Sequence, residues 1–216
     1  MKMISAMLAL LLWLSGHGVL AAPPPGTAYS TSLAPAAGRF LVAQRGLRGE
    51  YFGHTVVYLL QHDASGSVGV IVNRPLGMKV AEVLPDTEHE DIGASPVYSG
   101  GPVNRRIMVM LFRGNYPTEL ALHVDADIYA SSNTAILARM MSEHKPAHEL
   151  RMYAGQAGWA PGQLASELEH GSWFVTEGDP DMLFAPDAGD LWNRLIEQLD
   201  PPGILVLEQD RPAARL

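Results

Sequence analysis

The apolar positions of this chain fall into short runs rich in Val, Leu, Ile and aromatic residues, bounded by glycine or polar residues, a pattern typical of strands. Within the runs the apolar residues are nearly continuous instead of alternating, which predicts a sheet covered on both faces. The runs at 55–60 and 67–72 flank a short connection that contains Gly66, so we expect a hairpin. The predicted strands are 40–43, 55–60, 67–72, 107–112, 120–124, 150–154, 173–175 and 204–207.

Two later segments place apolar residues at helical spacing, and we predict Ser132 as the N-cap of the first. The spaced residues are Ile136, Leu137, Met140 and Met141 in the first segment and Leu191, Trp192, Leu195, Ile196 and Leu199 in the second. Strands come first and are then mixed with helices, without the strict alternation of a doubly wound fold. We therefore predict an α+β fold, a single domain built on a large mixed β-sheet with flanking helices.

The first residues follow the order of a secretory signal: Lys2, an apolar run at 4–14 and a small-residue site ending at Ala21. The apolar run is about half of the ~20 residues that a membrane-spanning helix needs. We predict a signal peptide over 1–21, a flexible leader rich in Pro and Ala over 22–37, and one domain over 38–216. The expected location is periplasmic or secreted, with no membrane span after cleavage.

The absence of cysteine and the distribution of charged residues exclude some classes of function. The chain has no Cys, which removes disulfides, thiol nucleophiles and thiolate ligands. Basic and acidic residues number 8 and 7 over 39–113, but 6 and 16 over 114–216. Because nucleic-acid affinity comes largely from cations that neutralise phosphates, we expect no direct nucleic-acid binding. Five scattered arginines form either surface ion pairs or a small anion pocket: Arg45, Arg48, Arg74, Arg105 and Arg106.

The chain lacks motifs that name a reaction. Ser67 does not have the spacing of a Gly-x-Ser-x-Gly nucleophile elbow, and there is no phosphate-binding loop or dinucleotide fingerprint. His144 and His148 are spaced like two metal ligands on a helix, but a proline between them disfavours that helix. His62 beside Asp63 is either an acid–base pair or a surface turn. We predict a non-enzymatic protein with no catalytic residue, metal or cofactor.

A glycine-flanked tryptophan, Trp159, precedes an amphipathic segment. We place Pro161 in the first helical turn, where its missing N–H is not needed, and Gly171 just past the helix end. Two interpretations stay open for this segment. Trp159 and the glycines form a packed corner, or the free N–H groups of the helix start form an anion or ligand site together with Gln163 and Glu167, which lie one turn apart.

Two further segments carry the same ambiguity. Gly100 and Gly101 follow a strand, where they permit a tight turn or leave backbone open to a partner, with Tyr98 lining it. Asn73 and Arg74 end a buried strand, where binding groups often lie, although Asn73 also suits the backbone groups of a turn. The candidate site for a ligand or partner is Asn73, Arg74, Tyr98, Gly100, Gly101, Gly158, Trp159, Gln163 and Glu167.

Together these segments resemble the YqgE/AlgH family of bacterial proteins, over nearly all of residues 38–207. The resemblance rests on Phe40 to Ala43, Gly46, Leu47, Phe52, Val56 to Tyr58, His62, Gly66, Gly69, Asn73 to Pro75, Gly100 to Val103, Gly158, Trp159, Gly162 to Leu164, Glu167 and Trp173. It implies a single α+β domain around a large mixed sheet, without an established enzymatic activity, and a frequent label as a regulator of transcription.

The chain departs from the family pattern at Gln44, Arg45, Gly49, Gln156 and Ala165, which weakens the transfer of any surface site near the first loop or the helix start. A signal sequence is also unusual for a family usually considered cytoplasmic. Our leading hypothesis is a non-enzymatic binding or regulatory module of the cell envelope that recognises an unknown protein or small ligand. The alternative is an intracellular regulator of gene expression that acts through a protein partner, and a hydrolase is a weaker third.

Overall fold

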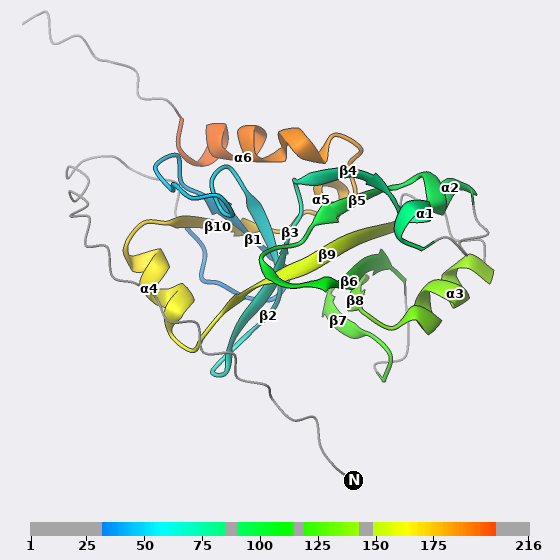
Figure 1. Ribbon diagram of the computed structural model, residues 1–216. Helices are drawn as coiled ribbons and strands as arrows, with labels where there is room; N and C mark the ends of the chain where they lie inside the picture. The colour runs from blue at the N-terminus through cyan, green and yellow to red at the C-terminus, as the bar shows by residue number, and fades with distance from the viewer. Residues whose placement is uncertain (1–31, 85–89, 115–118, 143–148, 202–216) are drawn as a thin grey trace, which may run out of the picture.

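The apolar runs form strands of one sheet in the structure, a computed structural model that describes residues 32–84, 90–114, 119–142 and 149–201 (Figure 1). The strands are β1 Arg39–Ala43, β2 Val56–Asp63, β3 Gly66–Ile71, β4 Pro75–Lys79, β5 Pro96–Ser99, β6 Val103–Arg113, β7 Leu122–Asp125, β8 Ile128–Ser131, β9 Leu150–Trp159 and β10 Trp173–Glu177. The helices are α1 Val80–Val83, α2 Glu90–Ala94, α3 Thr134–Ser142, α4 Gln163–Glu169, α5 Pro180–Leu183 and α6 Leu191–Leu199, with a 3-10 turn at Ala188–Asp190.

The sheet runs in the order β10–β1–β2–β3–β9–β6–β8–β7, with β5 beside β9 and β4 beside β5. β5 and β9 are parallel and the other described pairs are antiparallel, which confirms the predicted mixed sheet and α+β class. β2 and β3 form the expected hairpin. The long strand β9 pairs with β3 near its end and with β5 and β6 along its first part, so it joins the two halves of the sheet.

Two apolar clusters form the core. The larger cluster includes side chains of β1, β2, β3, β10 and α6, and the smaller includes side chains of β6, β8, β9, α1, α2 and α3. All five apolar positions predicted for the last helix are buried on α6. Figure 1 shows α6 lying across one side of the sheet, α4 at one end of the molecule, and α1, α2 and α3 at the other. Consecutive residues are buried along β1 and the first part of β2, so both faces of the sheet are covered there, as the continuous apolar runs predicted.

Two local expectations change, and a third is not tested. The predicted cap Ser132 is replaced by Asn133, whose Oδ1 accepts a hydrogen bond of 2.9 Å from the Ala135 N–H. Pro161 lies in the turn before α4 and not in its first turn, because β9 continues through the tryptophan and α4 begins only after Gly162, which adopts φ of 78°. The last predicted strand, 204–207, lies outside the described residues.

The final part of the predicted leader lies on the sheet edge. The Leu33 N–H donates to the Val175 carbonyl at 3.0 Å, and the Val175 N–H donates to Ser32 Oγ at 2.9 Å. Ala37 packs against the larger apolar cluster. Residues 32–37 thus cover the outer edge of β10, which would otherwise present unpaired backbone groups.

Candidate functional site

The segment that contains Trp159 forms a cluster of aromatic rings, an amide and a carboxylate around two buried indoles, which we call the tryptophan corner: Phe52, Trp159, Gln163, Glu167 and Trp173. Trp159 ends β9 and Trp173 begins β10, and both are almost fully buried, at 5% and 3% exposure. Phe52 stacks on the Trp159 ring at 6.0 Å between centroids and meets the Trp173 ring edge-on at 5.6 Å. Such pairs add to the stabilisation that burial of the rings provides.

One carboxylate holds the polar atoms of this corner. Glu167 Oε2 accepts hydrogen bonds from both indole N–H groups, at 2.9 Å from Trp159 and 2.8 Å from Trp173. Glu167 Oε1 accepts a third bond from the Gln163 amide at 2.9 Å. An indole N–H that is buried needs a partner, and these two have the same one. The carboxylate is therefore occupied by the chain itself.

The C-terminal end of α4 is closed by the chain's own groups, whereas its N-cap residue Gly162 makes no side-chain cap. In the turn before the helix, Gln163 Oε1 accepts from the Ala160 N–H at 3.1 Å. At its end, Gly171 adopts φ of 69°, its N–H donates to the Leu168 carbonyl at 3.0 Å, and the Ser172 N–H donates to the Glu167 carbonyl at 2.9 Å. These two bonds form a Schellman motif, which confirms the position predicted for Gly171. The seven-residue helix is a packed element with a satisfied C-terminus.

Asn73 and Arg74 hold the loop between β1 and β2. Asn73 is buried, its Oδ1 accepts from the Val56 N–H at 2.9 Å, and its Nδ2 donates to the His54 carbonyl at 3.0 Å. The Arg74 guanidinium donates to carbonyls of the same loop, those of Glu50 at 3.2 Å, Tyr51 at 2.8 Å and Gly53 at 3.2 Å. The turn interpretation of Asn73 is the one that its contacts match.

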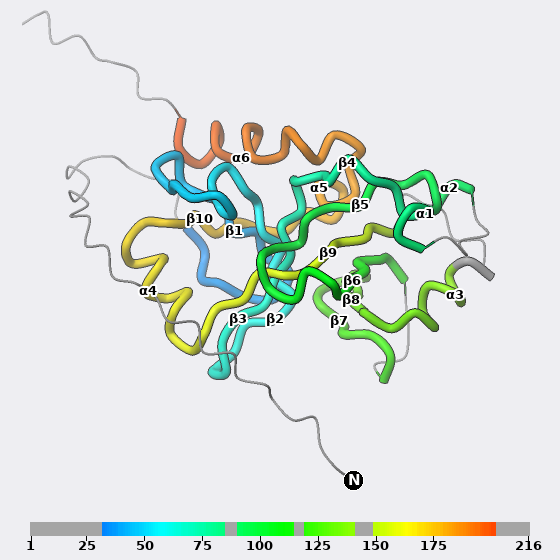
Figure 2. Tube along the Cα trace, in the orientation of Figure 1, coloured from blue at the N-terminus to red at the C-terminus, as the bar shows by residue number. Residues whose placement is uncertain are grey.

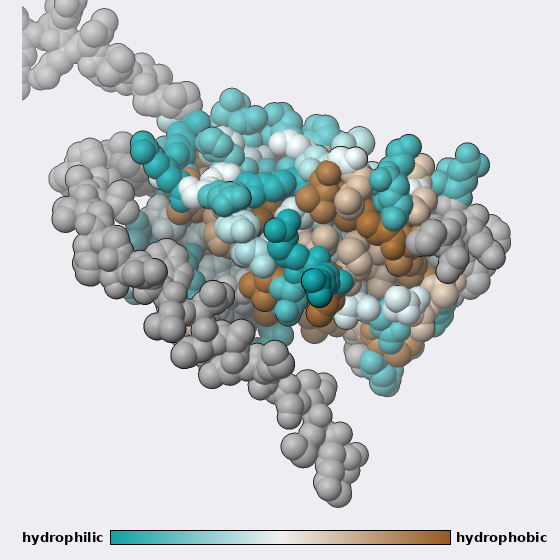
Figure 3. Space-filling view, in the orientation of Figure 1, coloured by the Kyte–Doolittle hydropathy of each residue, from teal (hydrophilic) through white to brown (hydrophobic). Residues whose placement is uncertain are grey.

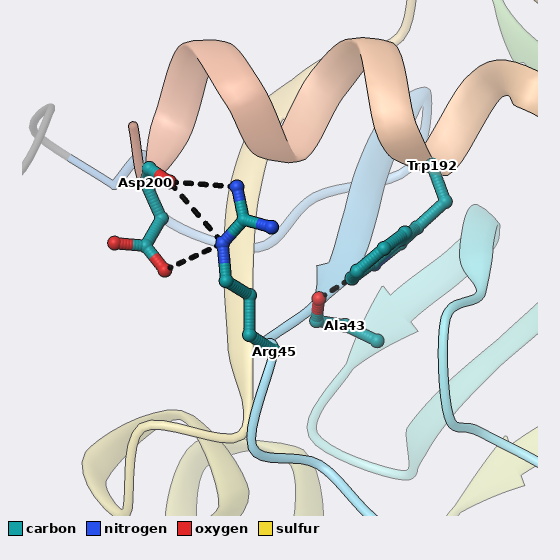
Figure 4. A network of polar contacts seen from close by, with 4 residues as sticks. All are labelled: Ala43, Arg45, Trp192 and Asp200. Carbon is teal, nitrogen blue, oxygen red and sulfur yellow. Dashed lines mark hydrogen bonds and ion pairs between the residues drawn. The ribbon is translucent and has the colours of Figure 1, made fainter. Parts of the chain in front are cut away.

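The same loop is attached to α6 at its other end (Figure 4). Arg45 donates from Nη2 to the Asp200 carbonyl at 3.0 Å and forms an ion pair from Nε to Asp200 Oδ2 at 3.4 Å. Trp192 on α6 donates from Nε1 to the Ala43 carbonyl at 2.8 Å, and its ring lies 4.3 Å from that of His54. Figure 2 shows the loop, in blue, between α4 and the C-terminal end of α6.

Gly100 and Gly101 mark a close backbone crossing and not an open surface. A Cβ on Gly100 would collide with the Gly155 carbonyl, and one on Gly101 would collide with the Gln156 backbone. The Ile71 N–H donates to the Gly100 carbonyl at 2.8 Å, and the Gly100 N–H donates to the Ala154 carbonyl at 2.9 Å. The glycines are needed because β5 lies against both β3 and β9 at this point.

Tyr98 is buried beside a charged residue that the sequence analysis did not single out. Its ring lies 5.7 Å from the Tyr153 ring, and the Arg151 guanidinium sits 4.8 Å above it. Arg151 is 8% exposed and donates to the Ala185 carbonyl, and burial raises the pKa of Tyr153 above its usual range. The only sequence signal for Arg151 is a single charge inside an apolar strand run.

The structure thus brings the candidate residues together in two groups. The first group lies at the loop at 45–54, which Asn73 and Arg74 contact and which supplies Phe52 to the tryptophan corner. The second group is Tyr98, Gly100 and Gly101, which pack against β9. Gly158 is exposed on β9. Among the residues of the loop, Tyr51 is 44% exposed and Arg48 is exposed without an ion pair or hydrogen bond to any residue that the structure describes.

A serine and a histidine meet on the β2–β3 hairpin. His62 Nδ1 lies 2.7 Å from Ser67 Oγ, but the Asp63 carboxylate is turned away and accepts from Ser65 and Gln61. Those hydrogen bonds, with Ser65 foremost, lower the pKa of Asp63 to about 2. A nucleophile of the serine type needs a third group that orients the base, and no described residue takes that role for His62.

The described ranges contain no group of three His, Cys, Asp or Glu side chains placed to hold a metal ion. His144 and His148 lie outside them. No helix within the described part of the chain has the length and apolar character to span a membrane.

Sequence comparisons relate the chain to one family. A family model described as AlgH-like matches residues 40–202. A UPF0301 protein of Streptomyces coelicolor is 34% identical over 173 residues, which cover 78% of this chain and 89% of the relative. A UPF0301 protein of Vibrio vulnificus is 30% identical over 168 residues, which cover 74% of this chain and 89% of the relative.

Two solved structures have a similar fold. A crystal structure of a protein from Corynebacterium diphtheriae aligns with a TM-score of 0.68 at 26% identity, over 80% of this chain and 92% of that one. The solution structure of the AlgH protein from Pseudomonas aeruginosa aligns with a TM-score of 0.65 at 25% identity, over 88% of this chain and 100% of that one. None of these names states a reaction or a ligand.

Proposed function

This chain belongs to the AlgH-like family, and we propose that it is a non-enzymatic binding protein that recognises a protein partner through the loop at 45–54. The observation that carries the proposal is the attachment of this loop by Arg74, which donates to three of its carbonyls while Tyr51 remains 44% exposed. A loop that is already ordered loses little conformational entropy when it binds.

The exposed residues of the loop suit a protein interface. Tyr and Arg are enriched among the residues that dominate binding energy at protein interfaces. In the loop, Tyr51 and Arg48 are exposed, and neither forms an ion pair with a described residue. Arg45 is already engaged with Asp200. The candidate residues Asn73, Arg74, Trp159, Gln163 and Glu167 then act as the frame that holds the loop and not as its contact surface.

Site-specific crosslinking tests this proposal in the cells that make the protein. A photoreactive benzoylphenylalanine in place of Tyr51 should yield one discrete adduct with a protein partner, whereas the same group in place of Glu169, an exposed residue of α4, should not. Arg48→Ala should reduce the adduct at position 51 at an unchanged melting temperature. Equal adducts from positions 51 and 169, or no effect of Arg48→Ala, would reject the loop as the recognition surface.

The cell envelope is the compartment that we propose, on the support of the signal pattern at 1–21. Intact-mass measurement of the purified chain distinguishes this from the intracellular alternative. A mature chain that begins at Ala22 supports export, and one that still begins at Met1 supports an intracellular regulator. In either compartment the acidic balance predicts that binding to duplex DNA is weak and lost by ~0.15 M salt.

A further inference from the structure

Strand β6 contains a bulge where it pairs with β9. Val103 pairs with Gln156 and Met108 pairs with Ala154, so four residues of β6 stand opposite Gly155 alone. Gly155 adopts φ of 75°, and a Cβ there would lie 2.7 Å from the Gly101 carbonyl oxygen and 2.8 Å from that of Val103. The glycine lets the two strands stay paired on both sides of the bulge. Bulges of this kind redirect side chains and are frequent beside functional sites.

The bulge places the side chains of Arg106 and Ile107 at an apolar groove between the sheet, α1 and α3. The groove encloses about 290 Å³, close to the lower end of small-molecule sites at ~300 Å³. In Figure 3 brown side chains gather between α1 and α3 on this face. The groove, which we call the β6 groove, is lined by Leu84, Arg106, Ile107, Met108, Met110, Ser132, Thr134, Leu137 and Met152.

The lining has one chemical asymmetry. Six of the described lining side chains are apolar. Met110, Leu137 and Met152 are buried and form the floor, whereas Leu84, Ile107 and Met108 are at least partly exposed. Methionine is flexible and adapts to differently shaped apolar groups. Among the described lining residues the single charge is Arg106, which is exposed and makes no hydrogen bond or ion pair with another described residue. Ser132 and Thr134, at the start of the nine-residue helix α3, add hydroxyl donors, and none of the described lining residues is acidic.

We propose that the β6 groove binds a medium-chain fatty acid, with its acyl chain along Ile107 and Met108, above the buried Met110 and Met152, and its carboxylate on Arg106. An apolar tail matches the six apolar side chains, and a carboxylate matches an unpaired guanidinium, which binds it through two parallel hydrogen bonds. The volume of about 290 Å³ accommodates a single acyl chain. This site is independent of the loop at 45–54, so each proposal can fail without the other.

Calorimetric titration of the full mature chain tests the class of ligand. Three ten-carbon probes of different head-group charge are compared below their micellar concentrations: decanoate, decanol and decyltrimethylammonium. We expect saturable one-to-one binding of decanoate, about tenfold tighter than decanol, with the cationic probe weakest. Binding of decanol as tight as that of decanoate, or binding of decanoate that does not saturate, would overturn the proposal.

Two adjacent arginines provide a matched pair of variants. Arg106→Gln should weaken decanoate binding about tenfold and leave decanol binding unchanged, whereas Arg105→Gln, which alters a neighbour that does not line the groove, should leave both unchanged. Both side chains are exposed, so both variants should keep the wild-type melting temperature. An equal loss of decanoate binding in the two variants would show a general surface charge effect and reject the site.

Methionine methyl resonances locate the bound chain. Decanoate should shift the ε-methyl signals of Met108, Met110 and Met152, which line the groove, and leave that of Met182, which packs on the larger cluster, in place. Shifts confined to Met182 would place the acyl chain elsewhere and contradict the proposal.

Discussion

The tryptophan corner and the β6 groove lie toward opposite ends of the molecule and use their polar groups in opposite ways (Figure 1). In the corner one carboxylate accepts from two buried indoles and an amide, so every polar atom named there has an internal partner. In the groove Arg106 stands over apolar side chains without a partner in the described residues. The region with the recognisable motif satisfies its polar groups internally, whereas the groove leaves its arginine exposed.

The contrast shows what a glycine-and-tryptophan motif reports. Large aromatic rings and close backbone crossings restrict the residues that can be accommodated, because a core packed at crystal-like density tolerates few changes in volume. An exposed arginine over a groove is restricted only by the ligand that it meets. A motif therefore indicates packing first, and binding has to be judged from groups that the fold leaves unpaired.

The largest effect is expected when the corner loses a ring. Trp159→Ala should lower the free energy of unfolding by about 3–5 kcal/mol, because the removed indole is buried and packs on Phe52 and Trp173. Urea denaturation followed by circular dichroism measures it, and Trp159→Phe, which keeps an aromatic ring, should lose less. A loss below about 1 kcal/mol would mean that the corner is not a major part of the core.

The second prediction compares two glycines with similar backbone angles, Gly155 at the β6 bulge and Gly162 beside the tryptophan corner. Gly155 and Gly162 have φ of 75° and 78°, but only Gly155 is enclosed, with backbone atoms within 3.1 Å of a Cβ position. Gly162→Ala should cost about 1 kcal/mol from the left-handed backbone alone, whereas Gly155→Ala should cost about 3 kcal/mol, because the bulge must also shift. Equal losses in denaturation curves would show that the enclosure of Gly155 has no energetic weight.

The third prediction concerns Glu167. Glu167→Ala leaves two buried indole N–H groups without their acceptor and should cost about 2 kcal/mol. In the sequence analysis Glu167 was only a candidate contact for a ligand or partner, whereas its three hydrogen bonds give it a role in stability. Glu169→Ala, an exposed change on the same helix, is the control and should stay within about 0.5 kcal/mol. Identical melting curves for the two variants would show that the hydrogen bonds of Glu167 do not stabilise the tryptophan corner.

Much of the fold was readable in the sequence because its signals are local. The apolar runs predicted the hairpin of β2 and β3, and the spacing of Leu191, Leu195 and Leu199 predicted the buried face of α6. Element boundaries were less accurate. β9 continues to Trp159 because it pairs there with Ser67, a partner 92 positions away in the chain that no local window contains, so Pro161 falls in a turn.

The sequence by itself determined the family, the α+β class, the absence of cysteine chemistry and the residues that crowd the corner, because each depends on residue type and spacing along the chain. Only the tertiary structure decided which polar side chains have an internal partner and which remain available to a ligand. Asn73 and Arg74 are satisfied by groups 17 and 23 positions away in the chain, and Glu167 by two indoles that end β9 and begin β10. Arg106, in contrast, lies on a bulge of β6 that depends on Gly155 of another strand. Hydrogen-bond partners across a sheet are set by strand pairing and register, so availability for a ligand is a property of the folded chain alone.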